Sequence, residues 1–490
     1  MLRRVVLQSL LSALPVLAVL ALILSLGALG ARMVLPRIAG QRAQIEDYLG
    51  RFLGRPVTIE SVRAAWEGWD PRLVLTGLRV LNGETLRPAM GFERAVIGID
   101  VWTSLGRRQL QLRGLALTGA EFTVARTRGG EIVIEGIDGT DARMLRWLLR
   151  QPQVAIEGTR IRWHDHQARH GAWALPYVRL DSAGSLARQG FKLTLRPTPE
   201  VGKHLLIAMS GMGEPFDRDW NADFYAEAED ISPALLRDYQ ASIRIRESGG
   251  SVQLRTWVAW RNGQVSEVAG EFKTGGFAVG AGENRFEMLA TSGRFLARAS
   301  PGGGWRIGAD RVAITTPDGS WPEARFGLAL APPDPRGARR LIAYASHLEL
   351  ADLAPILVLS ESLREESKAL VGRLRPHGLL REVELAYHPD RSGAARFYLK
   401  AGLDSVSVQR SPAIPGVERL SGVLEVNAEK GRLSLYGGQV QIDAVPHFNA
   451  PLRVERTSGE VGWHALADGW RLYTPGLEVE NPDLRLRIKG

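Results

Sequence analysis

The fold is decided by stretches such as residues 252–260, which have the sequence VQLRTWVAW. Successive side chains of an extended chain point to opposite faces. In this stretch the residues that share one face are Val252, Leu254, Thr256, Val258 and Trp260. Gln253 and Arg255 lie on the other face. This alternation with a period of two predicts a β-strand that has one apolar and one polar face.

The same alternation recurs along the chain. The apolar positions of the other runs are Leu110 and Leu112, Phe122 and Val124, Ile132 and Ile134, Phe191, Leu193 and Leu195, Trp220, Ala222, Phe224 and Ala226, Phe326, Leu328 and Leu330, Phe397 and Leu399, Leu433 and Leu435, Val440 and Ile442, and Leu484, Leu486 and Ile488. Turn signals such as Asn82-Gly83 and Asn262-Gly263 separate the runs. One strand per roughly 15 residues gives about 25–30 strands, and a sheet of that size must curl, split or close. The chain is therefore predicted to be mainly β, with an elongated, curled antiparallel sheet that forms a groove, and a few short helices.

Four segments are expected to be helical. Residues 38–53 have an apolar face made of Ile38, Ile45, Leu49, Phe52 and Leu53, and Gly54 and Pro56 follow. Residues 140–150 and 232–240 are shorter candidates, the second opened by Ser232-Pro233. The longest covers residues 352–372, with Asp352 as its cap. Its apolar stripe is Leu353, Ile356, Leu357, Leu363 and Leu370.

A further helix is predicted at the N-terminus, where the 27 residues from Val5 to Ala31 carry no charged side chain. At 1.5 Å per residue they form about 40 Å of helix, which is enough to cross a bilayer. Its predicted lipid-facing residues include Leu10, Leu14, Leu17, Leu20 and Leu24. The alternative is a cleaved signal peptide with Ala28-Leu29-Gly30 as its processing site. Either way, the rest of the chain is exported. The first alternative predicts a single-pass protein of the bacterial inner membrane with most of its chain in the periplasm.

The amino-acid composition excludes several kinds of chemistry and of binding partner. Its 490 residues include no cysteine, which excludes disulfides, thiolate metal sites and cysteine nucleophiles. The net charge is +9, from 62 basic and 53 acidic residues. The arginines alternate with acidic and apolar residues, and no basic helix or aromatic–basic motif accompanies them. No nucleic-acid partner is therefore predicted.

A metal site or an enzyme is not predicted either. His164, Asp165, His166 and His170 form the one tempting metal cluster, but in an extended strand Asp165 points away from its two neighbours. The carboxylate groups at residues 217–219 and 227–230 are expected to be solvated. The sequence contains no G-x-S-x-G elbow, P-loop, G-x-G-x-x-G or H-E-x-x-H motif. We therefore expect no catalytic residues and no cofactor.

Several segments, taken in order, resemble one known family. They are LGRPV at residues 53–57, AWEG at 65–68, PRLVL at 71–75, GIDVWTSL at 98–105 and LALTGA at 115–120, followed by stretches at 146–154, 161–165, 220–225, 378–383, 415–417 and 421–423. Together these are similar to the AsmA-like superfamily, and most closely to its YhdP branch. The resemblance covers essentially the whole chain. It implies an inner-membrane-anchored periplasmic protein that transfers phospholipid toward the outer membrane, and of which this chain is the N-terminal portion.

Four regions are expected on these grounds. Residues 1–37 form the membrane anchor and residues 38–150 the AsmA-like N-terminal region. Residues 151–351 form a β-rich groove segment. Residues 352–490 form a helix and a further groove segment whose C-terminal end is expected to be incomplete.

The functional hypothesis is a lipid conduit whose apolar strand faces hold acyl chains. The candidate residues for its groove are Leu110, Leu112, Phe122, Val124, Phe191, Leu193, Leu195, Trp220, Phe224, Phe326, Leu328 and Leu330. The expected partners are phospholipid, the inner membrane and an outer-membrane or periplasmic protein. The same alternation also describes a sheet packed shut on a dry core, and two alternatives stay open. One is an envelope scaffold that aids outer-membrane assembly by binding proteins, and the other is a glycan hydrolase.

Overall fold

The computed structural model describes residues 41–490 except 68–69, 84, 109–110, 129–131, 135–150, 167–171, 185–187, 213–218, 233–249, 282–283, 336, 360–364, 389–395, 412–413, 445–449, 467–468 and 483. The predicted anchor, with Leu10, Leu14, Leu17, Leu20 and Leu24, lies outside the described residues. Within the described part of the chain, no helix is both long enough and apolar enough to span a membrane. The chain divides into two compact units. Unit 1 is residues 1–199 and 205–220, and unit 2 is residues 200–204 and 221–490.

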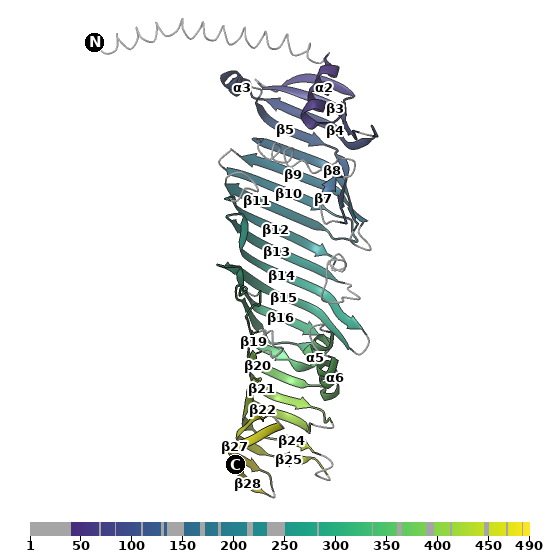
Figure 1. Ribbon diagram of the computed structural model, residues 1–490. Coiled ribbons are helices and arrows are strands. Elements are labelled where there is room, and N and C mark those ends of the chain that lie inside the picture. The colour runs from purple at the N-terminus through teal and green to yellow at the C-terminus, as the bar shows by residue number, and fades with distance from the viewer. Residues whose placement is uncertain are drawn as a thin grey trace, which may run out of the picture. The chain divides into compact units, whose positions relative to one another are not determined.

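The elements of unit 1 follow one another as two helices and eleven strands in the described residues (Figure 1). They are α2 (Arg42–Leu53), β1 (Val57–Thr58), β2 (Ser61–Glu67), β3 (Asp70–Leu81), β4 (Pro88–Ile99), α3 (Val101–Arg107), β5 (Leu112–Thr118), β6 (Glu121–Arg126), β7 (Ile132–Ile134), β8 (Gln153–Asp165), β9 (Ala172–Gly184), β10 (Arg188–Arg196) and β11 (His204–Met212).

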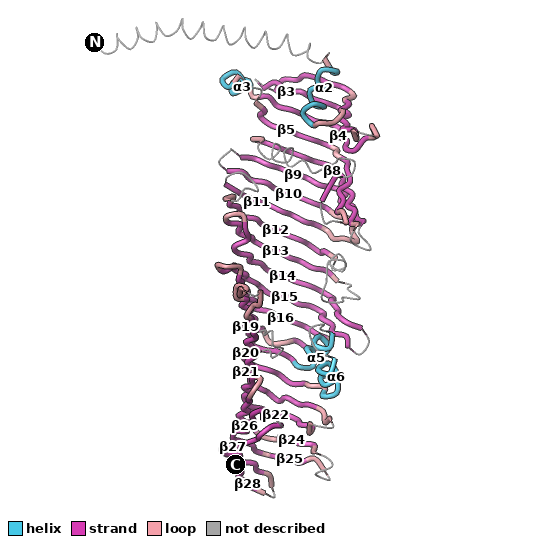
Figure 2. Tube along the Cα trace, in the orientation of Figure 1, coloured by secondary structure: helices cyan, strands magenta, loops and turns pink. Residues whose placement is uncertain are grey.

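Unit 2 contains the remaining strands and two more helices among its described residues, and Figure 2 shows how strands dominate it. Its elements are β12 (Asn221–Ile231), β13 (Ser251–Arg261), β14 (Gln264–Ala281), β15 (Asn284–Ser300), β16 (Gly304–Thr316), β17 (Gly319–Ser320), β18 (Ala324–Leu330), β19 (Leu341–Glu349), α5 (Leu350–Leu359), α6 (Glu365–Leu374), β20 (His377–His388), β21 (Arg396–Val408), β22 (Gly416–Asn427), β23 (Lys430–Gly437), β24 (Val440–Asp443), β25 (Leu452–Val454), β26 (Arg456–Leu466), β27 (Gly469–Glu480) and β28 (Arg485–Ile488).

The prediction of a mainly β chain with a large, curled antiparallel sheet and a few short helices is confirmed within the two units. One part of it is wrong, because β8 pairs in parallel with both β5 and β6. Parallel neighbours need a crossover of a dozen or more residues. The connection between Ile134 and Gln153 is long enough to supply one. The alternation of side chains identifies a strand but says nothing about its direction.

The helix predictions had mixed outcomes. The helix predicted at 38–53 is confirmed from Arg42 onward as α2, which ends at Gly54 in the left-handed conformation that glycine favours, while Ile38 lies outside the described residues. The segment at 352–372 contains α5 and α6, but α5 begins at Leu350, so Asp352 is not its cap. The Asp352 carboxylate instead accepts a hydrogen bond of 2.6 Å from Trp321 Nε1. Leu357, predicted to be in the apolar stripe, is exposed. The predicted helices at 140–150 and 232–240 fall outside the described residues, except for Ser232.

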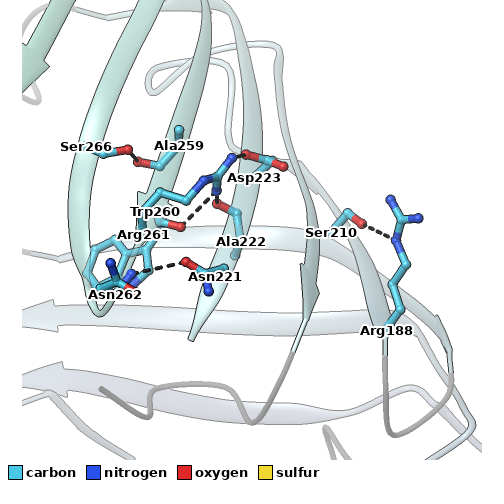
Figure 3. Close-up of polar contacts among 10 residues, drawn as sticks. All are labelled: Arg188, Ser210, Asn221, Ala222, Asp223, Ala259, Trp260, Arg261, Asn262 and Ser266. Atoms are coloured by element: carbon cyan, nitrogen blue, oxygen red, sulfur yellow. Dashed lines mark hydrogen bonds and ion pairs between the residues drawn. The ribbon is translucent and has the colours of Figure 1, made fainter. Parts of the chain in front are cut away.

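The turn predicted at Asn262-Gly263 joins β13 to β14 (Figure 3). Both residues have positive φ, 52° and 74°, which matches the twist of a two-residue hairpin. Hydrogen bonds from neighbouring polar groups hold this turn in place. The Asn262 backbone N–H donates to Asn221 Oδ1 at 3.2 Å, and Arg261 Nη1 donates to the carbonyls of Ala222 and Trp260 at 2.8 and 2.9 Å. The hairpin is thereby tied to β12, and the register across these three strands is set.

Candidate functional site

In unit 1, directly paired residues form one continuous apolar row across eight strands. We call it the row of unit 1. Its members are Val62, Leu75, Ala95, Leu117, Ile156, Leu180, Leu193 and Ile207, on β2, β3, β4, β5, β8, β9, β10 and β11. Directly paired residues of neighbouring strands lie on the same face of a sheet. The row therefore runs perpendicular to the strands along a single face.

Helix α2 covers the first part of this row. Ile45, Leu49 and Leu53 of α2 pack against a buried cluster that contains its first three members, Val62, Leu75 and Ala95. Leu75 is 0% exposed and Ala95 is 1% exposed. From Leu117 onward every member is partly exposed. The face is thus closed beneath α2, and farther along the row members are partly exposed, with Leu193 packed against the buried Leu175, Val178 and Leu195.

The position of α2 is held by Glu46. Its Oε1 accepts hydrogen bonds from Arg42 Nε at 2.9 Å and from the backbone N–H of Ile59 at 2.7 Å. Burial alone would raise the pKa of Glu46, but these hydrogen bonds hold it below its usual range. The ionised carboxylate therefore links the helix to Ile59, in the connection between β1 and β2.

A second and longer row crosses thirteen strands of unit 2, and we call it the row of unit 2. Its members are Phe224, Val258, Val268, Ala297, Ile307, Leu328, Ala343, Leu385, Leu399, Val426, Gly431, Trp463 and Leu472, from β12 to β27. Each is directly paired with the next. At about 4.8 Å per strand the row extends over about 58 Å.

Most members of the row of unit 2 are partly exposed, although Leu399 packs against a buried cluster of Ala345, Val383 and Ala401. Gly431 is its only buried member, and every other member is partly or fully exposed. A Cβ atom added at Gly431 would clash with the indole of Trp463, so this ring lies over the glycine. A sheet face packed against a second layer buries its central residues almost completely. The row of unit 2 therefore lacks such a second layer among the described residues.

The opposite face of the same strands carries a charge ladder. The directly paired residues are Glu227, Arg255, Glu271, Arg294 and Asp310, on β12 to β16, and their charges alternate in sign. Arg255 Nε lies 3.1 Å from Glu227 Oε1, and Arg294 Nε lies 3.2 Å from Glu271 Oε1. The ladder is a solvated surface, and the division between apolar and charged faces follows from the period of two.

Helix α5 contacts β14, β15, β19 and β20 in unit 2. Strands β16 and β18 lie between β15 and β19 in the sheet. Their members of the row, Ile307 and Leu328, stay partly exposed, so α5 does not cover this part of the row. Glu349, directly before α5, has a side-chain oxygen that is buried without a hydrogen-bond partner among the described residues. Burial raises the pKa of Glu349, and the nearby Asp352 and Asp404 raise it further.

The candidate groove residues have different positions. Leu193, Phe224 and Leu328 are members of the two rows. Phe122 packs against the cluster beneath α2, so it belongs to the covered part of the face. Leu195 is buried with Leu175 and Val178. The other described candidates are Leu112, Val124, Phe191, Trp220, Phe326 and Leu330, of which Trp220 is buried and the rest are partly exposed, whereas Leu110 lies outside the described residues.

Sequence reasoning missed many members of the rows, particularly the small ones. Ala95, Ala297, Ala343 and Gly431 have side chains too small to mark an apolar face by themselves. Leu75 and Leu117 lie in mostly apolar segments, LVL at residues 73–75 and LAL at 115–117, where both faces of the strand have apolar residues. Strand pairing was the missing information, because it aligns each residue with a neighbour on the same face.

The groups considered for metal binding or acid–base chemistry are held in structural contacts. Asp165 is buried, and its Oδ2 lies 3.4 Å from Arg126 Nη1. His170 falls outside the described residues. No group of three or more potential metal ligands comes together in the described part of the chain. Hydrogen bonds from Tyr225 and Arg255 lower the pKa of Glu227, and one from Lys203 lowers that of Asp230. A general acid needs the opposite shift, so these carboxylates suit a charged surface.

Comparison with known proteins agrees with this architecture. The family model of the YhdP protein matches residues 1–490, so the chain belongs to the YhdP family. A curated relative is the intermembrane phospholipid transporter YhdP of Escherichia coli strain K12. It is 24% identical over an alignment 492 residues long, which covers 94% of this chain and 36% of that protein. The chain therefore spans about a third of the length of this relative. No solved structure matches it significantly.

Proposed function

We propose that this chain is a non-enzymatic lipid conduit, in which the acyl chains of phospholipid slide along the uncovered parts of the two apolar rows. The observation that carries the proposal is the row of unit 2, where twelve of the thirteen paired positions are at least partly exposed. An elongated, groove-like sheet would give such a face its concave shape. Membership of the YhdP family and the name of the Escherichia coli relative support phospholipid as the cargo.

The energetics favour a long apolar surface over a single pocket. Each buried CH₂ group contributes about 0.8 kcal/mol, so a sixteen-carbon chain exposed to water costs about 13 kcal/mol. A conduit must offset this cost at every point of the path. The row of unit 2, about 58 Å long, exceeds the roughly 15 Å depth of one leaflet's hydrocarbon. Apolar contacts are non-directional, and the indole N–H of Trp463 is the one polar side-chain group among the members of the row.

The proposed location is the periplasm, with the chain anchored in the inner membrane by its N-terminal segment and moving lipid between the inner and outer membranes. Residues 5–31 support this placement by their lack of charge. An outer-membrane or periplasmic protein would receive the lipid at the far end. The charged opposite face suits an aqueous compartment, since its side chains stay hydrated while the apolar face holds lipid.

The test is photo-crosslinking of the full chain in membranes, with the crosslinker placed at Leu193, a partly exposed member of the row of unit 1. Lys192, next to it on the opposite face, and Leu75, beneath α2, are matched controls. We expect phospholipid adducts at Leu193 and none at either control. Equal labelling at all three sites, or no lipid at Leu193 and none co-purified by mass spectrometry, would contradict the proposal.

A charge placed on the apolar face of unit 1 distinguishes the hypothesis of a lipid conduit from that of a protein-binding scaffold. Leu193→Asp introduces a carboxylate at a partly exposed position that packs against Leu175, Val178 and Leu195, so circular dichroism must first show that the variant folds. With the crosslinker at Ile207, the next member of the row of unit 1, we expect Leu193→Asp to abolish lipid adducts and lipid transfer, while any capture of protein partners persists. Loss of protein capture with unchanged lipid transfer would instead favour the scaffold.

A further inference from the structure

Helix α3 is a short, firmly held helix of unit 1. Asp100 caps it, accepting hydrogen bonds from the backbone N–H of Thr103 at 2.9 Å and from its hydroxyl at 2.8 Å. The Ser104 hydroxyl accepts the backbone N–H of Gln111 at 2.8 Å, which ties the helix to the start of β5. These contacts fix the position of the α3 backbone relative to the start of β5.

The outer side of this helix is both aromatic and basic. Trp102 is 66% exposed, the second-largest exposed fraction among the large apolar side chains of the described residues. Gly106, four residues later and so on the same side of the helix, faces open space. Arg107 and Arg108 are exposed beside it. From Val101 to Ala120 the chain has three arginines and no acidic residue.

Helices α3 and α2 lie at the same end of the sheet in unit 1 (Figure 1). Tyr48 of α2 is also exposed, at 58%. The uncharged stretch of residues 5–31 ends eleven residues before Arg42, the first residue of α2. Eleven extended residues span at most about 40 Å. If that stretch is inserted in a bilayer, this end of unit 1 is tethered within that distance of the membrane surface.

We propose that α3 is a membrane contact, in which Trp102 enters the interface of the bilayer and Arg107 and Arg108 bind the phosphates of anionic lipids. Tryptophan favours this zone because its ring is apolar while its N–H remains hydrogen-bonded. Arginine binds phosphate groups through paired N–H donors. The contact would hold the α2-covered end of the row of unit 1 against the membrane. The inference rests on the membrane anchoring proposed above.

The absence of cysteine from the chain makes a direct test possible. Gly106→Cys in the full chain gives one labelling site where an added side chain meets no neighbour. Gly372→Cys in α6 of unit 2 is the matched control, since it is also an exposed helical glycine with open space around it. Each variant is labelled with an environment-sensitive fluorophore. It is then reconstituted into vesicles of phosphatidylethanolamine and phosphatidylglycerol that contain a nitroxide-labelled lipid.

We expect the nitroxide to quench the fluorophore at residue 106 several-fold more strongly than the one at residue 372. Adding Trp102→Ser should reduce that quenching. Arg107→Gln with Arg108→Gln should remove its dependence on phosphatidylglycerol. Equal quenching at residues 106 and 372 in a chain that stays in the membrane after alkaline extraction would overturn the inference. Lipid adducts at Leu193 in that same chain would show that the conduit proposal stands independently.

Discussion

The two rows differ in what covers them. In unit 1 the row begins beneath α2, where Leu75 is fully buried, and becomes partly exposed from Leu117 onward. In unit 2 most members of the row are partly exposed, its only buried member is Gly431, and Leu399 packs against the buried Ala345, Val383 and Ala401. Both are made by the same alternation of side chains, and all their pairs are antiparallel except Leu117 with Ile156 in unit 1. The comparison shows that strand patterning makes an apolar face, while a separate element decides whether that face is a core or a surface.

The largest expected effect comes from shortening matched leucines in the row of unit 1. Leu75→Ala should reduce the local free energy of unfolding by about 2–5 kcal/mol, because it leaves a cavity beneath α2. Leu193→Ala should cost about 1 kcal/mol or less, since its side chain is already partly exposed. Hydrogen exchange of the peptides containing β3 and β10 measures both. Equal losses would mean that Leu193 is as covered as Leu75 and that the face is closed.

An intermediate effect is expected from releasing α2. Glu46→Gln removes the charged partner of Arg42 and of the Ile59 N–H, and should weaken the docking of α2 by roughly 1–2 kcal/mol. Asp47→Asn is the control, because Asp47 pairs with Arg51 on the exposed side of the same helix. Exchange rates of the α2 amides report the difference. Similar rates in the two variants would show that Glu46 does not hold the helix.

The carboxylate of Glu46 also makes the docking of α2 depend on pH. Since the pKa of Glu46 is lower in the folded chain, the unfolded chain binds its proton at higher pH, and acid favours release of the helix. The stabilisation should be complete above about pH 4.3, the ordinary value for glutamate, and should disappear as the pH falls through the lower pKa of the folded state. In Glu46→Gln this contribution should be absent.

The smallest effect is expected on the charged face of unit 2. Arg294→Gln removes the ion pair with Glu271, but both side chains are about half exposed, so the free energy of unfolding should change by only about 0.5 kcal/mol. Lipid adducts at Val258 should be unchanged, because the substitution leaves the apolar face intact. A large loss of adducts would show that the two faces do not act separately.

Much of the fold could be predicted from local pattern. The runs around residues 191–195, 252–260 and 326–330 are strands, α2 lies where a period of 3.6 replaces the period of two, and Asn262-Gly263 forms its turn. The parallel pairing of β8 could not be predicted, because alternation carries no information about strand direction. Asp352 was misplaced as a cap because its actual partner, Trp321, is distant in the sequence and belongs to the tertiary structure.

The amino-acid sequence by itself determined that this chain forms two-faced strands, since alternation is a property of neighbouring residues in one segment. It also determined the absence of thiol chemistry and the uncharged N-terminal stretch. Only the tertiary structure decided which apolar residues are neighbours and which are covered. Strand register aligned Val258 with Val268 and Leu193 with Ile207, and the docking of α2 buried Leu75. These outcomes depend on contacts between different segments of the chain, which the pattern within one segment does not specify.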